Sequence, residues 1–109
     1  MKMNINMKKI VFFLLVQFVA IGAFAQEAAI KEAEVAYTKE DYGKAIELYE
    51  GLLKTHGESA EIYYNLGNAY YKENKIAPAI LNYERALLLD PGDGDIRFNL
   101  QLARQKSVD

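Results

Sequence analysis

The chain has 109 residues, 26% of them charged, a formal net charge of −2 and no cysteine. This length allows one domain, and the lack of cysteine excludes disulfides, thiolate metal sites and cysteine nucleophiles. The first quarter of the chain differs in composition from the remainder, so the domain is expected to follow it.

Residues 1–25 have the pattern of a cleavable export signal. Three lysines precede an apolar run from Ile10 to Ala25, which ends in small residues at the positions that a signal peptidase reads. The alternative is an uncleaved membrane anchor, but the run has 16 residues, whereas a spanning helix needs roughly 20. We expect cleavage after Ala25 and an exported protein, located in the periplasm or at the periplasmic face of the inner membrane.

The expected mature part is acidic. Removing residues 1–25 takes away three of the 13 basic side chains and none of the 15 acidic ones, which leaves 10 against 15 and a formal charge of −5. Nucleic-acid binding needs a basic surface that displaces counterions. A nucleic-acid partner is therefore not expected.

An internal repeat organises the rest of the chain. A shift of 34 residues superposes residues 44–50 on residues 78–84, and it also carries residues 62–66 onto residues 96–100. Two separate segments that agree on one period of this size are typical of stacked helix pairs.

Residues 26–59 are predicted to form the first and more divergent helix pair. Alanines at positions 29, 33 and 36 make a small apolar stripe on its first helix, and Ala45 and Tyr49 lie on its second. Glu32 stands in the middle of the face that would meet a preceding repeat. That outer face is therefore expected to be solvated, as the end of a finite stack requires.

Residues 60–93 are predicted to form the second pair, whose pattern is the most regular. Tyr63, Leu66, Gly67 and Tyr70 fall at i, i+3, i+4 and i+7, which is one stripe of a helix. The matching stripe of the next helix contains Ala79, Tyr83 and Ala86. Small residues where the two helices cross would let their backbones approach closely.

The boundaries of these helices also carry sequence signals. Ser59 suits an N-cap, Asn74 suits the left-handed residue after a helix, and Pro78 suits a first turn. The run Asp90–Asp93 then breaks the chain.

Residues 60–93 closely resemble the tetratricopeptide (TPR) repeat, and residues 26–59 resemble it more weakly. The resemblance implies an all-α fold, in which TPR helix-turn-helix repeats form a short right-handed α-solenoid with a concave groove. The positions that carry it in the second unit are Tyr63, Leu66, Gly67, Tyr70, Ala79, Tyr83, Ala86 and Pro91.

Residues 94–109 are interpreted as a C-terminal capping helix. They keep an apolar stripe toward the preceding repeat, with Ile96, Leu100 and Ala103, but carry polar residues at positions 97, 101 and 104, where a further helix would pack. A polar outer face is typical of a terminal unit. The alternative is the start of a third repeat in a chain that continues.

The sequence offers no catalytic centre, and we expect neither an enzyme nor a cofactor or metal site. His56 is the only histidine, and it has no set of companions suited to catalysis or metal binding. Phosphate-binding loops, nucleophile elbows and helical His-Glu metal motifs are missing from the sequence.

The groove is the expected site of function, because the resemblance implies that the first helix of each pair lines it. Its tyrosines would bury apolar side chains of a peptide or partner helix, while its asparagines pair with backbone amides. The alternative is that these tyrosines pack on one another and close a narrow groove. The candidate partner-binding residues are Tyr37, Tyr64, Asn65, Asn68, Tyr71, Lys72, Phe98 and Leu102, and position in the repeat adds Ile30, Glu34, Thr38, Asn99 and Gln105.

A narrower resemblance comes from the Ala-Phe-Ala-Gln that ends the signal, the run Ile62–Tyr71 and the run Asp95–Leu100. Together they look like the BatE-type repeat proteins of the Bacteroides aerotolerance operon. That resemblance implies an envelope scaffold that works with membrane-bound von Willebrand-type proteins.

The expected function is that of a non-enzymatic scaffold or adaptor of the bacterial cell envelope, which binds a partner peptide or helix in its groove. The alternative is a structural subunit that assembles through its stack faces in a membrane-associated, aerotolerance-type complex. The expected partners are proteins, membrane-anchored envelope proteins among them, and no small-molecule substrate. Because so small a stack is marginally stable, self-association is a further hypothesis.

Overall fold

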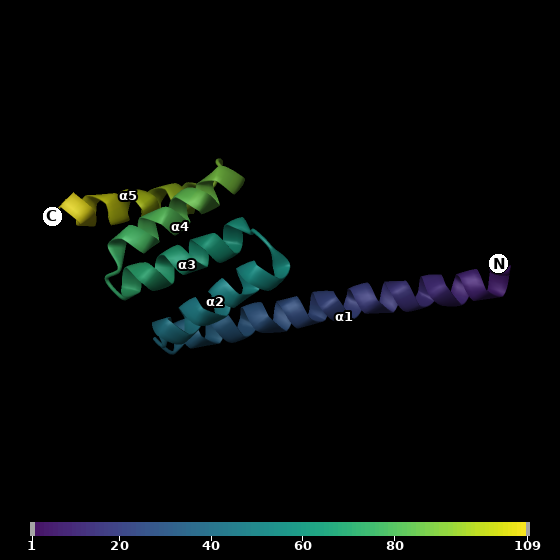
Figure 1. Cartoon of the computed structure of the whole chain (residues 1–109). Helices are drawn as coiled ribbons and strands as arrows, with labels where there is room; N and C mark the ends of the chain where they lie inside the picture. The colour runs from purple at the N-terminus through teal and green to yellow at the C-terminus, as the bar shows by residue number, and fades with distance from the viewer. Residues whose placement is uncertain (1, 109) are drawn as a thin grey trace.

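The computed structural model describes residues 2–108, apart from the side chains of residues 18–20, and this part contains five α-helices and no strand (Figure 1). Each helix packs against the next in sequence order, and α3 also contacts α5. This arrangement confirms the predicted all-α stack of TPR-like helix pairs. The helices are α1 (Ile5–Thr38), α2 (Tyr42–His56), α3 (Ala60–Lys72), α4 (Ile76–Leu89) and α5 (Gly94–Val108).

Helix α1 is much longer than the others and continues without a break through Ala25 and Gln26. Asn4 caps it, because its side-chain oxygen accepts a hydrogen bond from the Met7 amide at 2.8 Å. The N-terminal half projects away from the other helices (Figure 1), and its described side chains between Ile5 and Ala25 are exposed. By length and composition this helix can cross a membrane, a property it shares with N-terminal signal sequences. Cleavage after Ala25 stays a prediction.

The largest core cluster joins α1, α2 and α3. Ala33 and Ala36 of α1 are buried against the second helix, as the alanine stripe predicted, while Glu32 is exposed. Tyr49 is 1% exposed and is among the largest fully buried side chains of the described part of the chain. The cluster consists of Ala33, Ala36, Ala45, Tyr49, Leu52, Ile62, Leu66 and Ala69.

The close approach predicted between α3 and α4 is also present. Gly67 faces the ring of Tyr83, with no room between them for a side chain on residue 67. Ala79 and Ala86 of α4 are fully buried in the same contact region. The small residues therefore bring the two backbones together, as close packing requires.

The turns repeat the period of the sequence. Ser59 caps α3 through a hydrogen bond from the Ile62 amide at 3.3 Å, and Asn74 has the left-handed conformation expected of it, with φ 62°. Glu40 has φ 63° at the equivalent position of the first pair. The two turns differ in residue type but share one backbone conformation.

Helix α5 buries the apolar stripe predicted for it, Ile96, Leu100 and Ala103. The polar residues of its other face contact the preceding elements: the Arg104 guanidinium lies 2.8 Å from a Glu84 carboxylate oxygen of α4, and the Arg97 guanidinium donates a hydrogen bond to the Pro91 carbonyl. A capping role for this helix stays a prediction.

Candidate protein-binding groove

Three adjoining hollows lie between the first helices of the successive pairs, which run in the same direction (Figure 1). We call them the acidic, middle and aromatic hollows, with volumes of about 460, 290 and 220 Å³. Glu34 lines both the acidic and the middle hollow, whereas Tyr37 and Asn68 line both the middle and the aromatic one. Shared walls make the three hollows one continuous groove.

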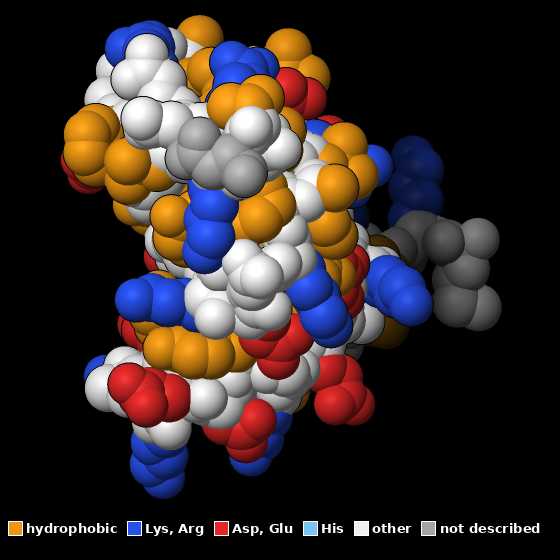
Figure 2. Space-filling model, turned by 90° about the vertical axis from the view of Figure 1, so that its left-hand side faces the viewer, with side chains coloured by type: hydrophobic (Ala, Val, Ile, Leu, Met, Phe, Trp, Pro, Cys, Tyr) orange, Lys and Arg blue, Asp and Glu red, His pale blue; other side chains and the backbone are white. Residues whose placement is uncertain are grey.

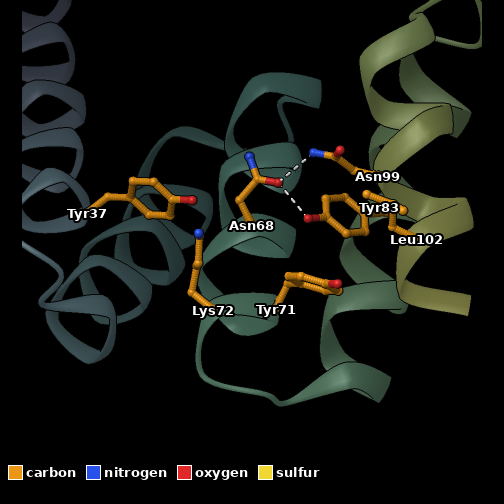
Figure 3. A pocket seen from close by; sticks show the side chains of 7 residues that line it. All are labelled: Tyr37, Asn68, Tyr71, Lys72, Tyr83, Asn99 and Leu102. Carbon is orange, nitrogen blue, oxygen red and sulfur yellow. Dashed lines mark hydrogen bonds between the residues drawn. The ribbon is translucent and has the colours of Figure 1, made fainter. Parts of the chain in front are cut away.

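The aromatic hollow is built by residues from four helices (Figure 3). Tyr37 of α1 stands on one side and Leu102 of α5 on the other, with side chains of α3 between them. Leu102 is 39% exposed, so this hollow offers apolar surface to a ligand. Its lining residues are Tyr37, Asn68, Tyr71, Lys72, Tyr83, Asn99 and Leu102.

A hydrogen-bond network ties the floor of the groove to α5. The Asn68 side-chain oxygen accepts from the Tyr83 hydroxyl and, at 3.0 Å, from the Asn99 amide nitrogen (Figure 3). The Asn99 nitrogen also donates to the Tyr64 hydroxyl at 3.0 Å. Among the hydrogen bonds of the described residues, none uses the Asn68 amide nitrogen. Asn68 is thus held in place while keeping donors for a ligand.

The buried tyrosines of the groove stay protonated at physiological pH. Burial raises the pKa of Tyr49 to about 12, with a smaller contribution from the negative charges of Glu34 and Glu61. Burial likewise raises the pKa of Tyr83 and Tyr37. Their hydroxyls are therefore neutral hydrogen-bonding groups.

Charge changes sign along the groove. The acidic hollow is lined by Glu27, Glu34 and Glu61 together with a single lysine, Lys31. The aromatic hollow is lined by Lys72 and by no carboxylate. Figure 2 shows the end of the stack at which α1, α3 and α5 finish. Most acidic side chains lie in its lower half, where Figure 1 places α1 and α2, and basic side chains lie at the bottom as well as in the centre and upper half.

The structure brings five of the eight candidate residues together in the aromatic hollow: Tyr37, Asn68, Tyr71, Lys72 and Leu102. Asn65 lines the neighbouring middle hollow. Tyr64 supports the floor by accepting the Asn99 hydrogen bond. Phe98 lines none of the three hollows, and its ring is 60% exposed.

Two tyrosines of the middle and aromatic hollows, Tyr49 and Tyr83, were not anticipated from the sequence, and neither were Glu27, Lys31 and Glu61 of the acidic hollow. The spacing of the two tyrosines placed them on the inner stripes of the second helices, and both are indeed buried there. A tyrosine is long enough that its hydroxyl reaches past the neighbouring helix, so Tyr49 also lines the middle hollow and Tyr83 the aromatic one. Helical spacing gives the direction of a side chain but not how far it reaches.

The part of the chain that the structure describes contains no group of three His, Asp or Glu side chains that could hold a metal ion. His56 ends α2, is exposed, and has its Nδ1 atom 2.7 Å from the Thr55 hydroxyl.

The comparisons with known proteins agree with this architecture. The tetratricopeptide repeat profile matches residues 60–93. The peroxisomal targeting signal receptor of Saccharomyces cerevisiae is 33% identical over 67 residues, which are 62% of this chain but only 11% of the receptor.

A solved structure of the CopN-Scc3 complex contains a chain of similar fold, with a TM-score of 0.74 and 19% identity. The match covers 77% of this chain and 49% of that one. The chain thus spans about a tenth of the yeast receptor and about half of the matched chain in the complex. At this identity the structural match shows a shared helical-repeat fold, beyond the one TPR unit that the profile detects.

Proposed function

We propose that this protein is an exported, non-enzymatic scaffold of the bacterial cell envelope that holds a segment of another protein in its groove. The observation that carries this proposal is the continuous groove itself. The ring of Tyr71 offers apolar surface, and the amide group of Asn68 beside it is held in place and keeps its donors for a ligand. Protein segments are recognised by that combination of groups.

Export rests on the sequence of residues 1–25, and an aerotolerance-type complex rests on the narrower resemblance described above. Intact-mass measurement of the protein purified from envelope fractions tests export directly. A mature chain that begins at Gln26 is expected. A protein found in the cytoplasm with residues 1–25 still attached would contradict the proposal.

Binding in the groove is tested by affinity capture from envelope extract with the wild-type protein and two variants. Tyr71→Ala with Lys72→Ala removes ring surface and charge from the aromatic hollow, while Leu88→Ala alters a side chain that is 83% exposed and lines none of the three hollows. Proteins held by the wild type and by Leu88→Ala should be lost with the double variant.

Circular dichroism must show that the double variant remains folded, because Tyr71 also packs against the cluster of Ala79, Tyr83, Leu100 and Ala103. Capture that persists with the folded double variant would show that partners are held elsewhere. The stack-face alternative would then be preferred.

A further inference from the structure

We propose that the groove selects an extended peptide with a basic residue at one end, an acidic residue about five positions away and an apolar side chain next to the acidic one. This inference rests on the proposed function and adds the chemistry of the partner. The acidic and aromatic hollows, at the two ends of the groove, carry this inference.

The acidic end has carboxylates that are available to a basic partner. Glu27, Glu34 and Glu61 line one hollow. The ion pairs of the described residues are Lys75 with Glu73 and Arg104 with Glu84, so none of these three carboxylates is in an ion pair there. Against the positive charges of Lys31 and of the amino group that cleavage would leave on Gln26, one net negative charge remains, and it favours a lysine or arginine of the partner.

The opposite end of the groove is basic. Lys72 lines the aromatic hollow, is exposed and takes part in neither ion pair of the described residues. The Lys106 amino group lies 4.9 Å from the centre of the Tyr71 ring, which places a second positive charge beside the same hollow. An acidic side chain of the partner is favoured here.

The aromatic hollow, at the basic end of the groove, also offers a seat for an apolar side chain. Tyr37, Tyr71 and Leu102 surround the aromatic hollow, and all three keep part of their surface open to solvent. Burying an apolar side chain among them removes that surface from water. The same three residues belong to α1, α3 and α5, so one ligand would contact all three first helices.

An extended segment fits the groove better than a helix does. The Asn68 donors serve a peptide whose backbone acceptors are free, whereas the backbone of a helix is already hydrogen-bonded. Glu61 and Lys72 lie eleven positions apart on α3, which corresponds to about 16 Å along the helix axis. An extended peptide covers that distance with about five residues, and this sets the expected spacing between its two charges.

The test is selection from a phage-displayed library of random decapeptides, flanked by constant residues so that no free terminus is presented. The bait is the protein purified from cells that produce the full chain. Four baits are compared: wild type, Tyr71→Ala, Glu61→Lys with Lys72→Glu, and Glu47→Lys with Lys54→Glu. The last is a matched charge exchange at exposed positions of α2 that line none of the three hollows.

Wild type should enrich peptides with a basic and an acidic residue four to six positions apart and an apolar residue next to the acidic one. The groove exchange brings the formal charge of both ends close to zero, so it should lose this charge order, and the α2 exchange should behave as wild type. For a synthetic peptide of the selected sequence, reversing its charges should weaken binding about tenfold at low salt, and much less at high salt, where exposed charges are screened.

The two proposals fail in different ways. This inference would be overturned if peptides that need Tyr71 for binding showed no charge order with wild type. It would also be overturned if they showed a charge order that the groove exchange leaves unchanged. Either outcome would leave groove binding intact. If Tyr71→Ala enriched the same peptides as wild type, or if no bait enriched any peptide, the result would count against the proposed groove binding as well as against this inference.

Discussion

Gly67 and Tyr83 meet without any spare space: a Cβ atom on residue 67 would lie 2.5 Å from two carbons of the Tyr83 ring. The ring cannot easily withdraw, because its hydroxyl is hydrogen-bonded to Asn68 and its side chain is 2% exposed. The crossing of α3 and α4 therefore depends on the absence of one methyl group.

Gly67→Ala should destabilise the fold by about 1–3 kcal/mol, the usual cost of overpacking a well-filled core. Urea unfolding followed by circular dichroism measures this. Gly51→Ala is the control, since nothing lies within 4 Å of a Cβ there; in the middle of α2 it should stabilise by about 0.5–1 kcal/mol. Equal effects of the two substitutions would contradict the packing argument.

Glu40 provides a second prediction, because it holds a left-handed conformation, with φ 63°, that costs a residue with a side chain about 1–2 kcal/mol. Glu40→Gly should therefore raise the unfolding free energy, by up to about 1 kcal/mol. Lys39, its neighbour, has φ −80°, so Lys39→Gly relieves no strain and should not stabilise. The same urea unfolding experiment compares the two variants.

The Asn68–Tyr83 hydrogen bond is suited to a double-mutant cycle. Asn68→Ala removes the acceptor of both Tyr83 and Asn99 and should cost about 1–3 kcal/mol, because buried donors lose their partner. Tyr83→Phe should cost less, and the two effects should be coupled by about 0.5–1.5 kcal/mol. Strictly additive free energies would show that this hydrogen bond contributes nothing to stability.

The raised pKa of Tyr49 determines how the stability of the fold should depend on pH in the alkaline range. The pKa of Tyr49 in the folded state, about 12, lies above the ordinary value of 10.0. The stabilisation that this difference gives to the folded state is therefore complete below pH 10 and is lost as the pH rises toward 12. The loss should be of the order of 2–3 kcal/mol, since one pKa unit corresponds to about 1.4 kcal/mol. Tyr49→Phe should lose correspondingly less stability between pH 10 and 12 in urea unfolding. Identical pH profiles would contradict the assignment.

Much of the fold was predictable because it depends on spacing. The stripes that contain Ala33, Leu66 and Leu100 follow from helical periodicity, and the left-handed turn at Asn74 follows from residue type. The left-handed turn at Glu40 carries no residue signal of its own and is visible only through the repeat, one period before Asn74.

The groove was predicted less completely, for reasons of side-chain reach. Position in the repeat identified Tyr37, Tyr71 and Leu102, but it also proposed Phe98, which lines none of the three hollows. The hydrogen bond from the Tyr70 hydroxyl to Glu50, at 3.0 Å, joins residues of α3 and α2. Contacts between helices depend on crossing geometry that periodicity does not contain.

The continuity of α1 past Ala25 fixes the height of the groove above any bilayer that holds the N-terminal segment. Tyr37 follows Ala25 by twelve positions on one unbroken helix, a rise of about 18 Å, with no hinge at which the stack could swivel. A partner would then meet the groove at one depth and in one orientation. Proteolytic release would give the same groove free rotation in solution.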